Sequence, residues 1–300
     1  MSARRAAVIG AWLIAGVTLA AARQQPTFRA AIEAVRVDVL VTDGGRPVAG
    51  LRPEDFELRD NGVPQQIDLV DAVQMPLNLV FVFDLSESVA GEPLAHLKDA
   101  SRAVLDGLLA DDRVALVGFT QAVQLGSPLT RDHERVAAAL ANARPAGNTS
   151  WLDAVFAGLM VAESEPGRSL VLAFTDGMDT TSWLAPDAVN SIARRTGVVV
   201  YGIAAGAARA PADLQKLTDL TGGRLIAVDT TKVLRGTFLE VLDEFRHRYV
   251  LAFSPRGVPA SGWHALTVRL RSKRATVTAR PGYFAERPPP ADSTATPAIR

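Results

Sequence analysis

Apolar and polar residues alternate at both ends of the chain, with the period of two that is typical of half-buried β-strands. Valines recur at every second position in residues 35–41, and residues 266–270 show the same alternation. Near the N-terminus, residues 56–59 and 67–70 flank an Asn61-Gly62 turn. Asn-Gly tolerates positive φ, so this arrangement predicts a hairpin.

The C-terminal end has a matching pattern. An apolar run covers residues 249–253, and residues 276–278 follow residues 266–270 after a polar turn at 272–274, which predicts a second hairpin. Each end has roughly 40 residues, too few to bury a stable two-sided sheet without disulfides. We therefore expect the two ends to pair with each other.

Between the two ends, apolar runs alternate with helical patterns, which is typical of a parallel sheet covered by helices on both faces. Runs with little polar character suit strands that are buried on both faces. The expected strands are residues 78–83, 114–119, 170–174 and 198–203, with a short edge strand at 123–125. The expected helices are residues 92–109, 132–143, 151–162, 186–195, 211–221 and 231–246.

These patterns predict an α/β fold with a doubly wound, mostly parallel sheet, inserted in a smaller discontinuous β-sandwich. The sandwich comprises residues 28–72 and 247–285, and the α/β domain comprises residues 73–246. Residues 286–300 contain three successive prolines and lack apolar periodicity, so we expect a disordered tail there.

The N-terminus has the pattern of a secretory signal peptide. Arg4 and Arg5 precede an uncharged run, residues 6–22, that ends in small residues. As a helix this run spans about 25 Å, less than the roughly 30 Å of a bilayer's hydrocarbon core. We expect cleavage after residues 1–22, and an exported protein that is periplasmic, attached to the cell envelope or secreted. An uncleaved anchor is the alternative, and only then do we expect membrane contact.

Composition excludes several classes of function. Lys plus Arg and Asp plus Glu both total 32, so no net field favours nucleic acid, and we expect no nucleic-acid partner. The absence of cysteine excludes disulfides, thiolate metal sites and a cysteine nucleophile. Hydrophobic residues make up 48% and charged residues 21%, as in ordinary globular proteins.

Oxygen-bearing side chains lie at three places in the predicted α/β domain. Asp84, Ser86 and Ser88 follow its first strand, Thr149 precedes its third helix, and Asp176 follows its third strand. Ligands bind at the carboxyl edge of such sheets, where we expect these side chains to meet. Carboxylates and hydroxyls are hard oxygen ligands that suit Mg²⁺, with Mn²⁺ or Ca²⁺ as alternatives. The sequence therefore predicts a magnesium site.

The same residues fill the motif DxSxS, then Thr, then Asp before Gly, and here the chain resembles the von Willebrand factor A (VWA) family with its metal-ion-dependent adhesion site. The resemblance implies that Ser86, Ser88 and Thr149 coordinate the metal. It implies that Asp84 and Asp176 bind it directly or through water, and that an open position receives an Asp or Glu carboxylate of a protein partner. The flanks resemble bacterial VWA-related secreted proteins more loosely, at residues 41–43, 51–56 and 280–283.

We therefore expect an adhesion or binding module and not an enzyme. The alternative is a divalent-metal-dependent hydrolase of the phosphohydrolase type, since haloacid-dehalogenase-like enzymes also place an Asp after the first strand. Their second Asp, the general acid, corresponds to Ser86 here. The G-x-S-x-G pattern of serine hydrolases is absent.

Other residues near the predicted site have two interpretations each. Asp84 and the serines after it are also residue types that cap helices, although capping alone does not explain Thr149 and Asp176. Trp151 and Trp183 either pack within the protein or form a rim that contacts a partner.

Overall fold

The computed structural model describes residues 34–70, 75–206, 211–271 and 274–286, which belong to one unit of the chain. The predicted signal peptide and residues 287–300 of the predicted tail lie outside these ranges. Within the ranges, no helix has both the length and the apolar character that are needed to cross a bilayer.

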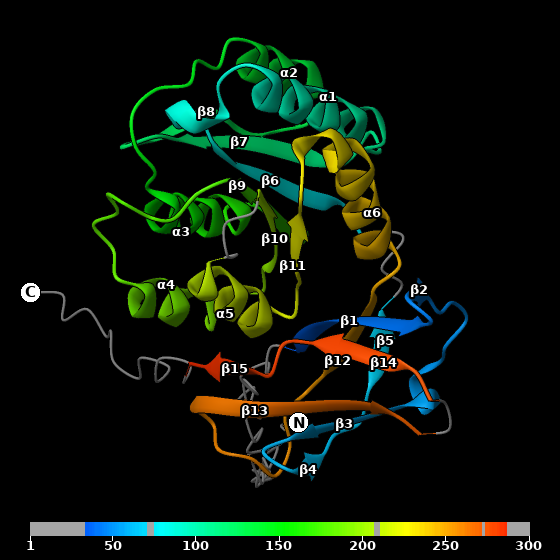
Figure 1. Ribbon diagram of the computed structural model, residues 1–300. Helices are drawn as coiled ribbons and strands as arrows, with labels where there is room; N and C mark the ends of the chain where they lie inside the picture. The colour runs from blue at the N-terminus through cyan, green and yellow to red at the C-terminus, as the bar shows by residue number, and fades with distance from the viewer. Residues whose placement is uncertain (1–33, 71–74, 207–210, 272–273, 287–300) are drawn as a thin grey trace, which may run out of the picture. The chain divides into compact units, whose positions relative to one another are not determined.

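A mostly parallel sheet lies at the centre of the α/β part, with the strand order β11-β10-β9-β6-β7-β8 (Figure 1). Its strands are β6 (Leu77–Asp84), β7 (Arg113–Phe119), β8 (Val123–Thr130), β9 (Arg168–Thr175), β10 (Val199–Ala205) and β11 (Leu225–Val228). Strand β8 pairs antiparallel with β7, and the other neighbours pair parallel. The predicted α/β class with a mostly parallel sheet is confirmed.

Helices cover both faces of this sheet (Figure 1). Along β6, Leu79, Phe81 and Phe83 pack into one helical layer, and Val80 and Val82 pack into the other. Burial on both faces explains why β6 is a continuous apolar run. The first layer contains α1 (Glu92–Asp106), α2 (His133–Ala141) and α6 (Leu234–Arg246), and the second contains α3 (Trp151–Ala162), α4 (Pro186–Ala193) and α5 (Ala212–Thr221).

Helix α3 packs closely against β6 because Gly158 has no side chain. A Cβ at this position would lie 2.5 Å from Val82 Cγ2, so any larger residue would push the helix away from the sheet. This contact holds α3 against β6 two residues before the end of that strand.

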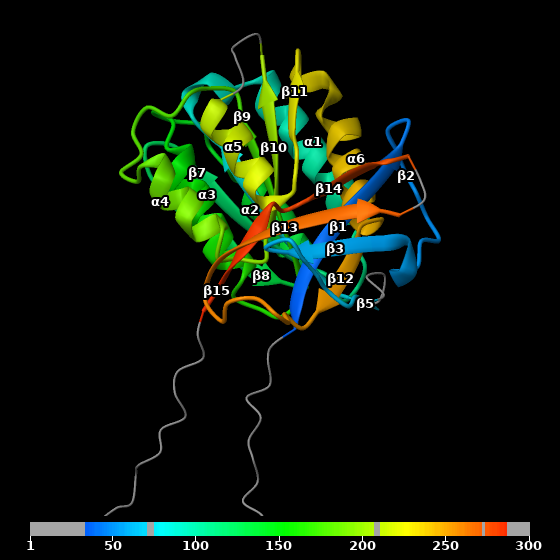
Figure 2. The ribbon, with the colours of Figure 1, turned by 90° about the horizontal axis from the view of Figure 1, so that it is seen from below.

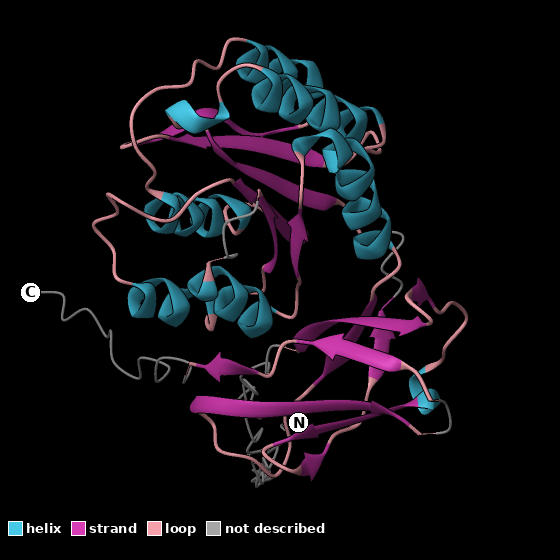
Figure 3. Cartoon of the chain, in the orientation of Figure 1, coloured by secondary structure: helices cyan, strands magenta, loops and turns pink. Residues whose placement is uncertain are grey.

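Strands from the two flanks form two antiparallel sheets (Figures 2 and 3). One sheet has the order β14-β1-β12-β5, with β2 paired to β1, and the other has the order β15-β13-β3-β4. The bounds are β1 (Val35–Asp43), β2 (Arg46–Pro47), β3 (Phe56–Asp60), β4 (Val63–Pro64), β5 (Asp68–Val70), β12 (Tyr249–Phe253), β13 (Gly262–Leu270), β14 (Thr276–Ala279) and β15 (Gly282–Ala285). Short 3₁₀ helices lie at η1 (Pro53–Asp55), η3 (Glu87–Val89) and η4 (Thr231–Val233).

Each of these sheets contains strands from both flanks. Strand β1 pairs with β12 and β14, and β3 pairs with β13. Their inner side chains share one apolar core, to which Val37, Phe56 and Phe253 contribute. The flanks thus bury their apolar surface together, while the domain boundaries given above stay predictions.

The pairing in both predicted hairpins is wrong. The Asn61-Gly62 turn joins β3 to the short strand β4. The strand that was predicted to pair with β3 is β5, and it pairs with β12 in the other sheet. Likewise β14 pairs with β1, whereas β13 pairs with β3 and β15. Alternation shows which face of a strand is buried, but both sheets face the same core, so the pattern fits either sheet.

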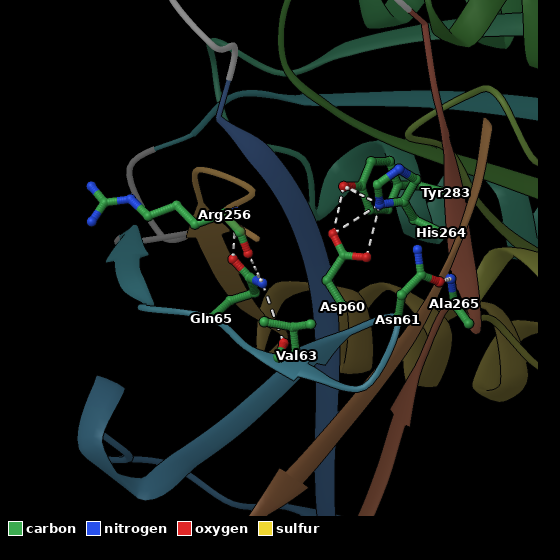
Figure 4. Close-up of polar contacts among 8 residues, drawn as sticks. All are labelled: Asp60, Asn61, Val63, Gln65, Arg256, His264, Ala265 and Tyr283. Carbon is green, nitrogen blue, oxygen red and sulfur yellow. Dashed lines mark hydrogen bonds and ion pairs between the residues drawn. The ribbon is translucent and has the colours of Figure 1, made fainter. Parts of the chain in front are cut away.

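The chain leaves the β3–β4 hairpin at Gln65 (Figure 4). Gln65 N donates to Leu58 O, so the backbone is still held by β3 at this point. The Gln65 side chain bonds to the backbone of Arg256: Nε2 donates to the carbonyl at 3.0 Å, and Oε1 accepts from the amide at 2.9 Å. These bonds direct the following residues away from β3 and toward β12.

Candidate functional site

Asp84 is the last residue of β6, at the carboxyl edge of the sheet, and it is fully buried. Its Oδ1 accepts a hydrogen bond from Ser86 N at 2.9 Å, and its Oδ2 accepts one from Thr175 Oγ1 at 2.8 Å. Strand β9 ends at Thr175 and lies beside β6, so strand pairing positions this donor. The sequence pattern did not indicate Thr175 as a site residue.

Burial raises the pKa of the Asp84 carboxyl above its usual value. Hydrogen bonds from Ser86 and Thr175 oppose this rise, and the negative charge of Asp176 adds to it. In the described part of the chain, Asp84 forms no ion pair with Lys, Arg or His. Its neighbours are therefore neutral or negative, which favours a cation at this position.

A row of oxygen atoms extends from the end of β6 to the end of β9. The Ser86 and Ser88 Oγ atoms lie 3.0 Å apart, and Ser88 Oγ donates to Asp176 Oδ1 at 2.8 Å. Ser86 is the N-cap residue of η3, and it is buried while Ser88 is exposed. The row therefore begins inside the protein and reaches its surface.

Thr149 lies at the same edge, in the segment that leads into α3. Its carbonyl oxygen accepts hydrogen bonds from the Thr180 and Thr181 amides, so the loop after β9 holds it in place. A Cβ on Gly177 would lie 3.8 Å from Thr149 Oγ1, so this hydroxyl lies beside the residue that follows Asp176. The structure thus places the five predicted residues at one edge of the sheet.

Gly147 shapes the loop that carries Thr149. Its φ is +66°, a left-handed conformation that favours glycine. Its carbonyl oxygen accepts from Glu87 N at 3.2 Å, and the neighbouring Ala146 N donates to Leu85 O at 2.9 Å. The loop after β6 and the loop before α3 are therefore joined directly through their backbones.

Two further carboxylates fix the loop between β9 and α4. Asp153, in the first turn of α3, accepts hydrogen bonds from the Trp183 and Leu184 amides at 2.9 Å each. Asp179 accepts one from Leu152 N at 3.0 Å. The sequence pattern indicated a role in the site for neither residue. An acidic residue in the first turn of a helix indicates a carboxylate that accepts backbone hydrogen bonds there. The sequence does not show which loop donates those bonds.

The oxygen atoms at this edge fit a small divalent cation. Mg²⁺ takes six oxygen ligands at about 2.1 Å, so adjacent ligands lie about 3.0 Å apart. The separations of 3.0 and 2.8 Å in the row from Ser86 through Ser88 to Asp176 are hydrogen-bond lengths that are also close to this spacing. Across the residues that the structure describes, no three His, Asp or Glu side chains gather as a metal site, so an ion at this edge depends on the hydroxyls.

Comparison with known proteins classifies the α/β part. The family pattern of the von Willebrand factor type A domain matches residues 78–239, more than half of the chain. The chain belongs to the VWA family. VWA domains are generally protein-interaction modules, and the match covers β6 with Asp84 and extends into α6.

Solved structures share this fold. A von Willebrand factor type A protein from Catenulispora acidiphila has a TM-score of 0.51 and 13% identity, over 82% of this chain and 75% of that one. Proximal thread matrix protein 1 from the mussel byssus has a TM-score of 0.52 and 16% identity, over 61% of this chain and 49% of that one. At such low identity the similarity concerns the fold alone.

A curated relative covers a shorter region. The uncharacterized protein sll0103 of Synechocystis is 29% identical over 108 residues, which are 35% of this chain and 26% of that protein. The chain thus matches about a quarter of the length of this relative.

Proposed function

We propose that this VWA domain is an exported protein-binding module. It holds a divalent cation, preferably Mg²⁺, and through that cation binds a carboxylate of a partner protein. The observation that carries the proposal is the row of oxygen atoms from Ser86 through Ser88 to Asp176, at the spacing of adjacent ligands. Membership of a family of protein-interaction modules supports it. The proposed ligands are Asp84, Ser86, Ser88, Thr149 and Asp176.

The residues of the site have different roles in this proposal. The Ser86, Ser88 and Thr149 hydroxyls offer uncharged oxygens, and Asp84 and Asp176 supply the negative charge. Two carboxylates balance a divalent charge without filling its coordination sphere. A bound Mg²⁺ supplies one further coordination position, for an Asp or Glu carboxylate of the partner.

Binding, and not catalysis, is the activity that we propose. A phosphohydrolase needs a general acid beside the carboxylate at the strand end, but the residue two positions after Asp84 is Ser86, whose hydroxyl bonds to Ser88. The histidine side chains bond to residues other than the five proposed ligands.

Export is proposed from the sequence of residues 1–22, in which Arg4 and Arg5 precede an uncharged run. An exported binding module acts in the periplasm, in the cell envelope or outside the cell, where protein partners with exposed carboxylates are available.

Thermal melting with and without Mg²⁺ tests the proposal. At a hundredfold excess over Kd, a ligand that binds only the native state adds about 2.7 kcal/mol of stability. We expect Mg²⁺ to raise the melting temperature of the wild type and to raise that of Asp176→Asn much less. The matched control is Asp187→Asn, because Asp187 is a carboxylate on α4 whose side chain is 93% exposed. An equal response to Mg²⁺ in wild type and Asp176→Asn contradicts the proposal.

A further inference from the structure

The loop between β9 and α4 exposes large apolar side chains at the candidate metal edge. Trp183 is 92% exposed and Met178 is 59% exposed. Leu184, which follows Trp183, packs against the core beneath α3. An almost fully exposed tryptophan is unfavourable in water, and tryptophan is enriched among the residues that dominate binding energy in protein interfaces.

This loop is held rigidly although the Trp183 side chain points into solvent. The Trp183 and Leu184 amides donate to the Asp153 carboxylate at 2.9 Å each. Ser182 Oγ donates to Asp179 Oδ2 at 2.6 Å and accepts from Asp153 N at 3.2 Å. The backbone around Trp183 is therefore ordered before any partner binds, which lowers the entropy cost of association.

Both ends of the loop are fixed at the candidate site. The loop begins at Asp176, and Met178 lies two residues further on. The residue that holds Trp183, Asp153, lies in the first turn of α3, which begins shortly after Thr149. Trp183 is thus anchored to the same two segments that supply Thr149 and Asp176.

The segments that carry the candidate ligands, and the neighbouring turn at residues 119–123, contain no positive side chain. Residues 84–91, 119–123, 145–150 and 175–185 lack Lys, Arg and His. Beyond a bound cation, these segments offer a partner carboxylate no ion pair. Within these described segments, the exposed large apolar side chains are Met178 and Trp183, so the additional binding energy available there is apolar.

We propose that Trp183, with Met178 beside it, is the specificity anchor of the binding surface. The partner that it fits is a protein segment with an Asp or Glu carboxylate and, a few residues away, an apolar or aromatic side chain. This inference rests on the proposed function, because the carboxylate is the one that the metal site receives. Tryptophan suits this role since it offers a large, flat contact area and loses little conformational entropy.

Selection from a random-peptide library on the immobilised full chain tests this inference. Wild type, Trp183→Ala and Trp263→Ala are compared in Mg²⁺ and in EDTA. Trp263 is the matched control, a tryptophan on β13 that is 39% exposed. Wild type and Trp263→Ala are expected to enrich peptides with both an acidic and an apolar residue. Trp183→Ala should enrich peptides with an acidic residue but without a preference for an apolar one. It should bind the peptides selected by the wild type roughly 10- to 100-fold more weakly.

The outcomes separate this inference from the proposed function. If Trp183→Ala keeps the apolar preference, or if wild type enriches no peptide, Trp183 is not the anchor. If Trp183→Ala loses the apolar preference while EDTA has no effect on wild type, the anchor is supported and the metal site is contradicted. If enrichment of acidic peptides requires Mg²⁺ but not Trp183, the metal site is supported and the anchor is overturned.

Discussion

At the scale of single residues, Thr175 differs from the candidate ligands in its role. Its hydroxyl donates to Asp84 Oδ2 at 2.8 Å, on the side of the carboxylate opposite the bond from Ser86 N. Thr175 is buried at the end of β9. It therefore orients Asp84 without lying in the row that leads through Ser88 to Asp176.

Thr175→Val keeps the shape of the side chain and removes this donor. We expect Mg²⁺ affinity, measured by calorimetry, to fall about tenfold, the size of effect that is usual when a residue that orients a metal ligand is lost. The matched control is Thr218→Val, since Thr218 is equally buried and its hydroxyl bonds to Gln215 O within α5. Equal affinity in wild type and Thr175→Val would show that Thr175 does not position the ligand.

The candidate ligands were predictable because short motifs place them next to predicted elements. Asp84, Ser86 and Ser88 follow one strand, Asp176 follows another, and Thr149 precedes a helix. Thr175 was not predictable, because a hydroxyl at a strand end is common and the residue that it orients is 91 positions away. Such pairs become visible only when strand order is known.

At the scale of elements, a buried polar cluster joins three strands of the sandwich (Figure 4). Tyr283 Oη on β15 donates to Asp60 Oδ2 on β3 at 2.8 Å. His264 Nδ1 on β13 lies 2.8 Å from Asp60 Oδ1 and 3.0 Å from Oδ2. The cluster therefore ties strands of the N-terminal flank to strands of the C-terminal flank.

Tyr283→Phe removes a hydrogen bond to a charged group, so we expect the free energy of unfolding in urea to fall by about 1.5–3 kcal/mol. Burial raises the pKa of Tyr283 above its ordinary value of 10.0, and the hydrogen bond to Asp60 and its charge add to the rise. The folded state then holds this proton more tightly than the unfolded state. The stability gained is complete below pH 10 and is lost as the pH rises further.

The difference in the free energy of unfolding between wild type and Tyr283→Phe is therefore expected to decrease above about pH 10. Urea unfolding at neutral and at alkaline pH measures it. A difference in unfolding free energy that stays constant across this range contradicts the raised pKa of Tyr283.

Two strands of the central sheet could not be predicted fully from the hydrophobic pattern. Strand β11 has only four residues and follows Gly222-Gly223, so no periodicity develops. Strand β8 was predicted to end at residue 125 but continues to Thr130. Gly126 and Pro128 interrupt its pattern, and the structure tolerates them because an edge strand needs fewer backbone donors.

At the scale of the whole described unit, buried arginines connect the flanks to the α/β part. Arg168 on β9 donates through Nε to Asp38 on β1 at 3.0 Å, and through Nη2 to Phe245 O in α6 at 3.0 Å. Arg280, which follows β14, donates to Arg194 O at the end of α4 at 3.0 Å. The flanks thus form hydrogen bonds with the α/β part as well as with each other.

A chain that ends at Arg246 lacks β12 and β14, the partners of β1. We expect residues 34–70 to become sensitive to protease, since their strands lose their hydrogen-bonded neighbours and part of their shared core. Limited proteolysis with mass spectrometry measures this. A chain that ends at Glu286 retains all the described strands and should stay protected. Protection of residues 34–70 in the shorter chain contradicts the interdependence of the flanks.

The central claim is that the edge formed by Asp84, Ser88 and Asp176 binds a divalent cation. Counting bound Mn²⁺ by electron paramagnetic resonance tests it most directly, because free and bound Mn²⁺ give different signals. We expect wild type and Asp187→Asn to bind a single Mn²⁺ that Mg²⁺ displaces, and Asp176→Asn and Ser88→Ala to bind it at least about tenfold more weakly. No bound Mn²⁺ in wild type, or equal binding by Asp176→Asn, would contradict the claim.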